Sequence, residues 1–271
     1  MQKSLYLTLF ILVAACNSVV VEKAKLQKVH NIALLSLFIS ERIPEVRGQG
    51  VIRKMDPEAK LQIAQDAVTA FHEALSQAGW GVISTEEVLA VPAYATFKKP
   101  KSQTGRVGKA DNAFEDRYFL PQGFDAIWLE TGAIPKRVGR PLVKNERDAV
   151  SEVLTKVQAD TAAIFRIQFC FRTFVRDSQE RARITAAASL QLLDKTGKVV
   201  HNLDRRDCGK DERGESRGSI GVAGEDWIYD PMQRENIRTL FRQAAEAEAA
   251  RLMDSLPYST RPPKPAEPLF N

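Results

Sequence analysis

The fold of this chain is decided by residues 163–203, AIFRIQFCFRTFVRDSQERARITAAASLQLLDKTGKVVHNL. Every second residue of its first part is apolar, which is typical of a strand with one buried face: Phe165, Ile167, Phe169 and Phe171 alternate with Arg166, Gln168, Cys170 and Arg172. Residues 184–192 repeat the alternation, and the segment 194–198 is typical of a tight turn before a third strand at 199–203. We therefore expect an antiparallel meander whose first turn is the polar segment 176–181.

The region before the meander predicts a parallel strand, helix and strand. Residues 32–39, IALLSLFI, form an apolar run typical of a strand covered on both faces. A helix is predicted from Pro57, with Asp56 as its N-cap, to its end before Gly79. A second strand follows at 80–83, and this order of elements implies parallel pairing.

Further helices complete the pattern. Ser84 and Glu87 form a capping box for a short helix, and longer helices are predicted at 145–159 and 232–256. The fold class is α/β, a two-layer or three-layer mixed sheet with a parallel start and an antiparallel meander, packed by long helices. We expect a signal peptide at 1–15, a linker at 16–28, a single domain at 29–256 with an insertion at 92–125, and a proline-rich tail at 257–271.

The first sixteen residues resemble a bacterial lipoprotein signal peptide. Lys3 precedes an apolar run at 5–15, which is too short to span a bilayer and ends in VAAC at 13–16. The resemblance implies that Cys16 becomes the first mature residue and carries fatty acyl chains such as palmitate. Asn17, in place of aspartate, favours the outer membrane. The alternatives are an ordinary secretory signal cleaved near Ala15 and an N-terminal membrane helix.

The composition limits the classes of partner. The hydrophobic content is 44% and the formal net charge is +5, without the dense basic stripe of a nucleic-acid-binding protein. We therefore expect no nucleic-acid partner and interpret the excess charge as a solvated face. Besides Cys16, the chain has Cys170 and Cys208, which could form a disulfide in an oxidising compartment only if Cys208 lies outside the meander.

The order of these elements resembles a known domain. A lipidation signal, the strand at 32–38, the helix face from Ala64 to Leu75, the pair Ala159 and Asp160, and the turn at 193–199 are similar to the α/β domain shared by CsgG, LpoB and the amino-terminal domain of TolB. The resemblance covers residues 28–256 and rests on core and turn positions. It implies a non-enzymatic envelope lipoprotein, since this superfamily has no catalytic residues to transfer.

The sequence differs from members of that superfamily in two features, and both affect the function that the resemblance implies. CsgG-like pores insert apolar hairpins into the membrane, whereas 97–109 and 176–183 are charged here. LpoB-like activators have a long disordered linker, whereas this linker of about a dozen residues spans only about 40 Å. An oligomeric secretion channel is therefore the less favoured alternative.

Catalytic and metal-binding groupings are weak in the sequence. His30, His72 and His201 lie on different elements and do not predict a metal site. The carboxylates Glu225, Asp226 and Asp230 flank Trp227 and Tyr229, a pattern that could bind or cleave a glycan. The favoured interpretation is that Asp230 and Pro231 begin the last helix.

The sequence therefore predicts an outer-membrane lipoprotein facing the periplasm, which binds or helps to assemble other envelope components. We expect no enzymatic activity, no cofactor and no metal. The expected partners are the membrane, through acylated Cys16, other envelope proteins and further copies of the chain. The alternative is a protein that binds or acts on peptidoglycan or another polysaccharide through the Trp227 region.

Overall fold

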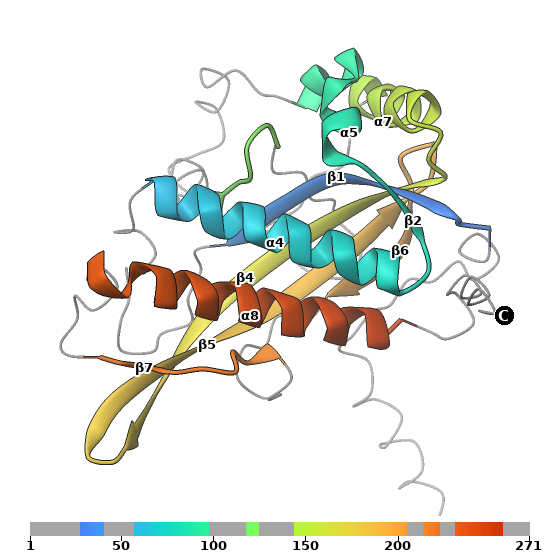
Figure 1. The fold of residues 1–271 in the computed structure, drawn as a ribbon. Coiled ribbons are helices and arrows are strands. Elements are labelled where there is room, and N and C mark those ends of the chain that lie inside the picture. Colours follow the sequence, from blue (N-terminus) through green and yellow to red (C-terminus); the bar gives the residue numbers. More distant parts are fainter. Residues whose placement is uncertain are drawn as a thin grey trace, which may run out of the picture.

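A mixed seven-stranded sheet forms the centre of the molecule (Figure 1). The computed structural model describes residues 28–40, 57–97, 118–124, 144–204, 214–222 and 231–256. The main strand order is β2-β1-β4-β5-β6, with β3 beside β1 and β7 beside β5. The strands are β1 (Asn31–Ser40), β2 (Gly81–Ile83), β3 (Tyr118–Phe119), β4 (Thr161–Arg176), β5 (Gln179–Leu193), β6 (Val199–Asp204) and β7 (Ile220–Gly221). β1 pairs in parallel with β2 and β4, and the other pairs are antiparallel, which confirms the predicted mixed sheet.

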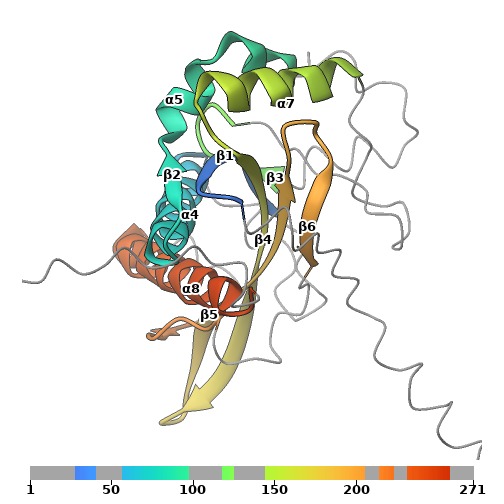
Figure 2. The ribbon, with the colours of Figure 1, turned by 90° about the vertical axis from the view of Figure 1, so that its right-hand side faces the viewer.

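Helices cover the two faces of the sheet unequally. α4 (Pro57–Gln77) and α8 (Arg234–Asp254) lie side by side across one face, as Figure 1 shows. α5 (Thr85–Ala90), the 3₁₀ helix η1 (Pro92–Phe97) and α7 (Lys144–Lys156) pack on the other face at one end only (Figure 2). The domain therefore has three layers at that end and two layers elsewhere.

The face under α4 and α8 holds the main apolar core. Phe71 of α4 meets Phe165 of β4 with ring centroids 4.6 Å apart, and Phe169 meets Phe241 of α8 at 4.9 Å. All four side chains are buried. The alternation that predicted β4 therefore marks the strand positions on which both long helices pack.

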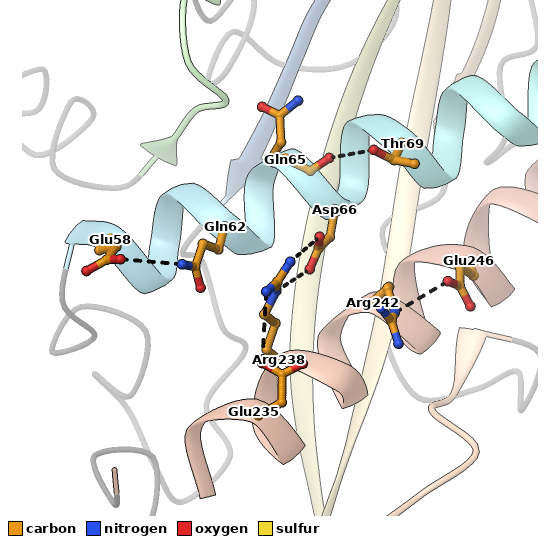
Figure 3. Close-up of polar contacts among 9 residues, drawn as sticks. All are labelled: Glu58, Gln62, Gln65, Asp66, Thr69, Glu235, Arg238, Arg242 and Glu246. Atoms are coloured by element: carbon orange, nitrogen blue, oxygen red, sulfur yellow. Dashed lines mark hydrogen bonds and ion pairs between the residues drawn. The ribbon is translucent and has the colours of Figure 1, made fainter. Parts of the chain in front are cut away.

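Polar contacts join the two long helices above this core (Figure 3). Arg238 of α8 donates hydrogen bonds to both oxygens of Asp66 in α4, at 2.8 and 2.9 Å. The hydrogen bond and the charge of Asp66 raise the pKa of Arg238. This bidentate pair fixes the relative position of α4 and α8.

Ser84 and Gly79 have the roles predicted for them at the start of α5 and after α4, and Asp160 acts at the start of β1. Ser84 accepts a hydrogen bond from Glu87 N at the start of α5, and Gly79 has a φ of +96° just after α4. Asp160 Oδ2 accepts from His30 N and Asn31 N at 2.9 and 3.0 Å. The carboxylate thereby holds the beginning of β1 beside the beginning of β4.

Beyond the apolar cluster under α5, η1 and α7, the opposite face of β4 and β5 is largely polar but buried. The buried polar side chains that alternate with the apolar core positions are Ser36, Arg166, Thr185, Ser189, Gln191 and Asn202. Arg166 lies opposite Ser189 and Gln191 opposite Asn202, so these side chains form cross-strand pairs. Burial on this face therefore extends past the apolar contacts of α7.

Three elements differ from the sequence predictions. The turn between β4 and β5 contains only Asp177 and Ser178, because the charged residues expected in a loop at 176–181 continue the ladder instead. The predicted insertion at 92–125 begins with the helix η1, in which Tyr94 is buried. The Tyr94 hydroxyl donates a hydrogen bond to Leu35 O at 2.9 Å. β7 forms at 220–221, where the sequence predicted no strand.

The predicted helix starts are also displaced. α7 begins at Lys144 and ends at Lys156, whereas the predicted helix covers 145–159. The N-cap position of α8 is Gln233, after a 3₁₀ turn that begins at Pro231, and not Asp230. The predicted proline-rich tail at 257–271 lies outside the described residues.

Between β6 and β7, the outer edge of β5 is completed by a side chain from α8. β6 pairs with β5 only as far as Ser189, and the next bridge on that edge joins Thr185 to Glu215. In between, Glu248 Oε1 accepts a hydrogen bond from Ala188 N at 2.6 Å. The carboxylate thus replaces the missing strand partner.

Arg251 compensates the buried charge of Glu248. Its Nε and Nη2 donate to the two carboxylate oxygens at 2.5 Å each, and Glu248 is fully buried. Gly214 passes so close that a Cβ there would lie 2.4 Å from Ala186 O and 3.1 Å from Glu248 Oε2. Only glycine leaves room for this approach of the chain to the edge of β5.

We predict that Glu248→Ala lowers the free energy of unfolding by about 3–5 kcal/mol, because it leaves a buried guanidinium without its carboxylate and Ala188 N–H without an acceptor. Urea denaturation measures this change. Glu246→Ala is the matched control, since Glu246 is exposed and pairs with Arg242 at 3.7 Å, and its cost should be below about 0.5 kcal/mol. Equal costs for the two variants would contradict the role of Glu248 in completing the edge.

Candidate functional site

The ends of β4 and β5 project beyond the helices as a hairpin, and we call residues Arg172–Arg183 the hairpin tip (Figure 1). In Figure 2 the hairpin again extends past α8, away from the end that carries α5 and α7. Val175 is 75% exposed, among the most exposed large apolar residues in the described part of the chain. The tip is therefore a projecting, exposed surface available for binding.

Four arginines gather on one face of the hairpin tip. The register places Arg172 opposite Arg183 and Phe174 opposite Arg181, and cross-strand partners share a face. Because side chains alternate along a strand, Arg176 lies on this face as well. We call this set the arginine face: Arg172, Phe174, Arg176, Arg181 and Arg183.

Contacts within the arginine face hold some of its side chains in place and leave others accessible. The Arg183 guanidinium lies 5.0 Å from the centre of the Phe174 ring, a cation–π geometry. Glu215 lies 3.4 Å from Arg183 and 3.7 Å from Arg172. The Arg172 side chain is nevertheless 58% exposed, so it remains accessible to a partner.

The charge balance of the hairpin tip is positive. The tip contains four arginines and two carboxylates, those of Asp177 and Glu180. Arg176 approaches Asp177 only to 3.7 Å, and both side chains are well exposed. Arg181 and Arg183 each have a buried Nε with no hydrogen-bond partner among the described residues. The tip therefore offers guanidinium groups suited to carboxylates or phosphates.

The turn that closes the hairpin is tight. Asp177 and Ser178 have φ values of 53° and 60°, as a two-residue type I′ turn requires. Aspartate tolerates this left-handed conformation better than most residues. The turn fixes the register of the tip, so the arginines occupy defined positions on its surface.

Most residues singled out in the sequence lie outside the described part of the chain. This holds for the lipidation site Cys16, for Cys208, and for the candidate glycan-binding group Glu225, Asp226, Trp227, Tyr229 and Asp230. Cys170 lies on the polar face of β4 and is disulfide-bonded. Its pairing with Cys208 stays a prediction.

The histidines lie on separate elements. His30 precedes β1, half-buried His72 lies on α4, and His201 is buried on β6. Within the described ranges, no three His, Cys, Asp or Glu side chains gather as metal ligands. No described helix combines the length and hydropathy needed to cross a bilayer.

His201 is the most perturbed histidine of the described chain. It is 1% exposed, lies opposite Leu192, and neither ring nitrogen has a hydrogen-bond partner among the described residues. Burial lowers its pKa from 6.5 to about 4. This burial could not be predicted, because nothing in the 199–203 segment shows which of its side chains are covered.

The chain matches no protein-family model and no curated protein sequence. Among solved structures it is similar to the hypothetical protein CT253 of Chlamydia trachomatis, with a TM-score of 0.32, 10% identity, and coverage of 83% of this chain and 96% of that one. It is also similar to lipoprotein GNA1162 of Neisseria meningitidis, with a TM-score of 0.25, 15% identity, and coverage of 77% and 94%. Both TM-scores are too low to support a conclusion, and the resemblance to the CsgG, LpoB and TolB domain stays a prediction.

We predict that His201 makes the fold sensitive to acid. Its imidazole stays neutral in the folded chain while the unfolded chain takes up a proton below pH 6.5. Its contribution to stability is therefore complete above that pH and is lost as the pH falls towards 4, by about 3 kcal/mol. Urea denaturation at pH 7 and pH 4 should show this loss in the wild type and a correspondingly smaller loss in His201→Leu. The same pH dependence in both proteins would show that His201 is not the cause.

Proposed function

We propose that this chain is a lipid-anchored envelope protein, acylated at Cys16, whose α/β domain is a non-enzymatic module that binds other envelope proteins through the hairpin tip. The main support for this proposal is the projecting, arginine-rich tip, in which the side chains of Arg172 and Arg176 are 58% and 66% exposed. A projecting surface of guanidinium groups suits binding, because arginine neither gains nor loses a proton at neutral pH and so supplies no general acid or base.

The position of the tip supports a role away from the anchored end. β1 and β4 run in parallel from paired starts at Ile32 and Thr161, so the linker joins the domain at the end of the sheet opposite the tip. The 16 residues of β4 extend about 50 Å, whereas residues 16–28 reach at most about 40 Å. A domain held by its linker would therefore direct the tip away from the leaflet that holds Cys16.

Asn17 after the acylated cysteine favours the outer membrane, in which case the tip would face the periplasm. A partner would then be met between the membranes, by exposed side chains and without any need to enter the bilayer. Association of several copies through other surfaces is compatible with this arrangement.

The proposal is tested by crosslinking in intact cells, with a photo-crosslinking amino acid in place of Val175. We expect a discrete adduct with another envelope protein, and its loss when Arg172→Glu and Arg176→Glu are added. The matched control carries the crosslinker in place of Lys195, in the exposed turn at the other end of the meander. Cys16→Ser should abolish palmitate labelling and release the chain from the membrane fraction.

Two outcomes would overturn the proposed function. Equal adducts from positions 175 and 195, or none from either, would show that the hairpin tip is not the binding surface. Palmitate labelling that persists in Cys16→Ser would show that the anchor lies elsewhere.

A further inference from the structure

The two edges of the hairpin tip differ. On the β5 side, β7 pairs with Arg181 and Ala182, and Val222 N donates to Glu180 O at 2.9 Å. On the β4 side, β1 pairs only as far as Gln168. No described segment pairs with residues 172–176 on that side, so within the described part of the chain the tip has one covered edge and one open edge.

The register shows which backbone groups the open edge presents. A two-residue turn makes Arg176 and Gln179 a hydrogen-bonded pair, and such pairs alternate with pairs whose N–H and C=O groups point outward. Thr173 and Val175 are therefore the outward-facing residues of β4. The backbone of Glu180, the cross-strand partner of Val175, also points away from the hairpin. Its carbonyl accepts a hydrogen bond from Val222 N on the other edge of the tip.

The side chains along the open edge would select an added strand by charge. Arg172, Phe174 and Arg176 lie on one face, and Thr173 with the 75% exposed Val175 lies on the other. A neighbouring strand places its own side chains beside these, where opposite charges attract and like charges repel. Acidic residues fit the first face and β-branched apolar residues fit the second.

Charge also argues against a second copy of the chain at this edge. Two β4 edges paired with each other would bring Arg172 and Arg176 of both copies together without a matching carboxylate on either strand. The same arginines would attract an acidic strand. The occupant that fits is therefore an acidic strand and not a second β4 edge.

We propose that residues 172–176 of β4 bind an extended acidic segment of another envelope protein as an added β-strand, with Asp or Glu beside the arginine face and β-branched residues beside Thr173 and Val175. Backbone hydrogen bonds to Thr173 and Val175 supply register, and the guanidinium groups supply specificity. This inference rests on the proposed function and identifies the chemistry of its partner.

The test uses the full chain with its anchor, purified in detergent, and a short peptide of alternating glutamate and valine. Binding is measured by fluorescence anisotropy of the labelled peptide. The matched probe is the same peptide fully N-methylated, which keeps the charges but cannot donate backbone hydrogen bonds. We expect at least tenfold weaker binding of the methylated peptide, because several backbone hydrogen bonds are lost.

Variants separate the contributions of backbone and charge. Val175→Pro removes one outward N–H and leaves the pairing with β5 in place, so affinity should fall at least tenfold. Arg172→Glu with Arg176→Glu should abolish binding. Lys195→Glu with Lys198→Glu, the same charge change at the other end of the meander, should leave affinity within twofold. Thermal unfolding of each variant shows whether the domain remains folded.

Three results would overturn the inference. Equal affinity for both peptides, or no affinity for either, would show that no strand is added at this edge. Arginine-dependent binding to phosphatidylglycerol vesicles without peptide binding would assign the arginine face to a lipid surface. A dimer that Val175→Pro converts to a monomer would assign the edge to a second copy. In the first two cases, a persistent adduct from position 175 would leave the proposed function standing.

Discussion

The antiparallel ladder between β4 and β5 is the interaction on which the rest of the structure depends. It runs from the pair Ala162 and Leu193 to the pair Arg176 and Gln179. β1 pairs with one side of this ladder and β6 and β7 with the other, while α4 and α8 pack on its apolar face. Because the ladder is longer than the helices that cover it, its far end projects as the hairpin tip (Figure 1). One element therefore supplies both the centre of the core and the candidate binding surface.

The sequence predicted those parts of the fold in which burial alternates along the chain. Phe165, Ile167 and Phe169 predicted β4 correctly, because beyond Ile164 these apolar residues alternate with Arg166 and Gln168 on the other face. The turn was predicted too long, because residues 172–180 are exposed apart from half-buried Phe174, and a ladder without a buried face leaves no alternation to detect. Glu248 was missed although a signal exists: it lies between Ala244 and Leu252 on the apolar face of α8, where a carboxylate is out of place.

The functional site was less predictable than the fold. The candidate sites predicted from the sequence, Cys16 and the Trp227 region, lie outside the described residues. The charged segment 176–183 predicted a turn and argued against a membrane pore, but it did not predict a binding surface. Its importance depends on register and on the lengths of β1 and β7, and neither can be deduced from composition. Asp160 belongs to the sequence pattern that resembles the CsgG, LpoB and TolB domain, and the structure shows its physical role. Its carboxylate holds the start of β1, at the end of the sheet where the chain enters from the linker.

Amide hydrogen exchange measured by NMR shows whether the ladder extends through Arg172–Arg176 and whether its outer edge is open. The backbone N–H groups of Arg172, Phe174 and Arg176 point toward β5, whereas those of Thr173 and Val175 point outward. We predict slow exchange at the first three and fast exchange at Thr173 and Val175 in the purified chain. Uniformly fast exchange from 172 to 183 would contradict the ladder, and protection of Thr173 and Val175 would contradict the open edge.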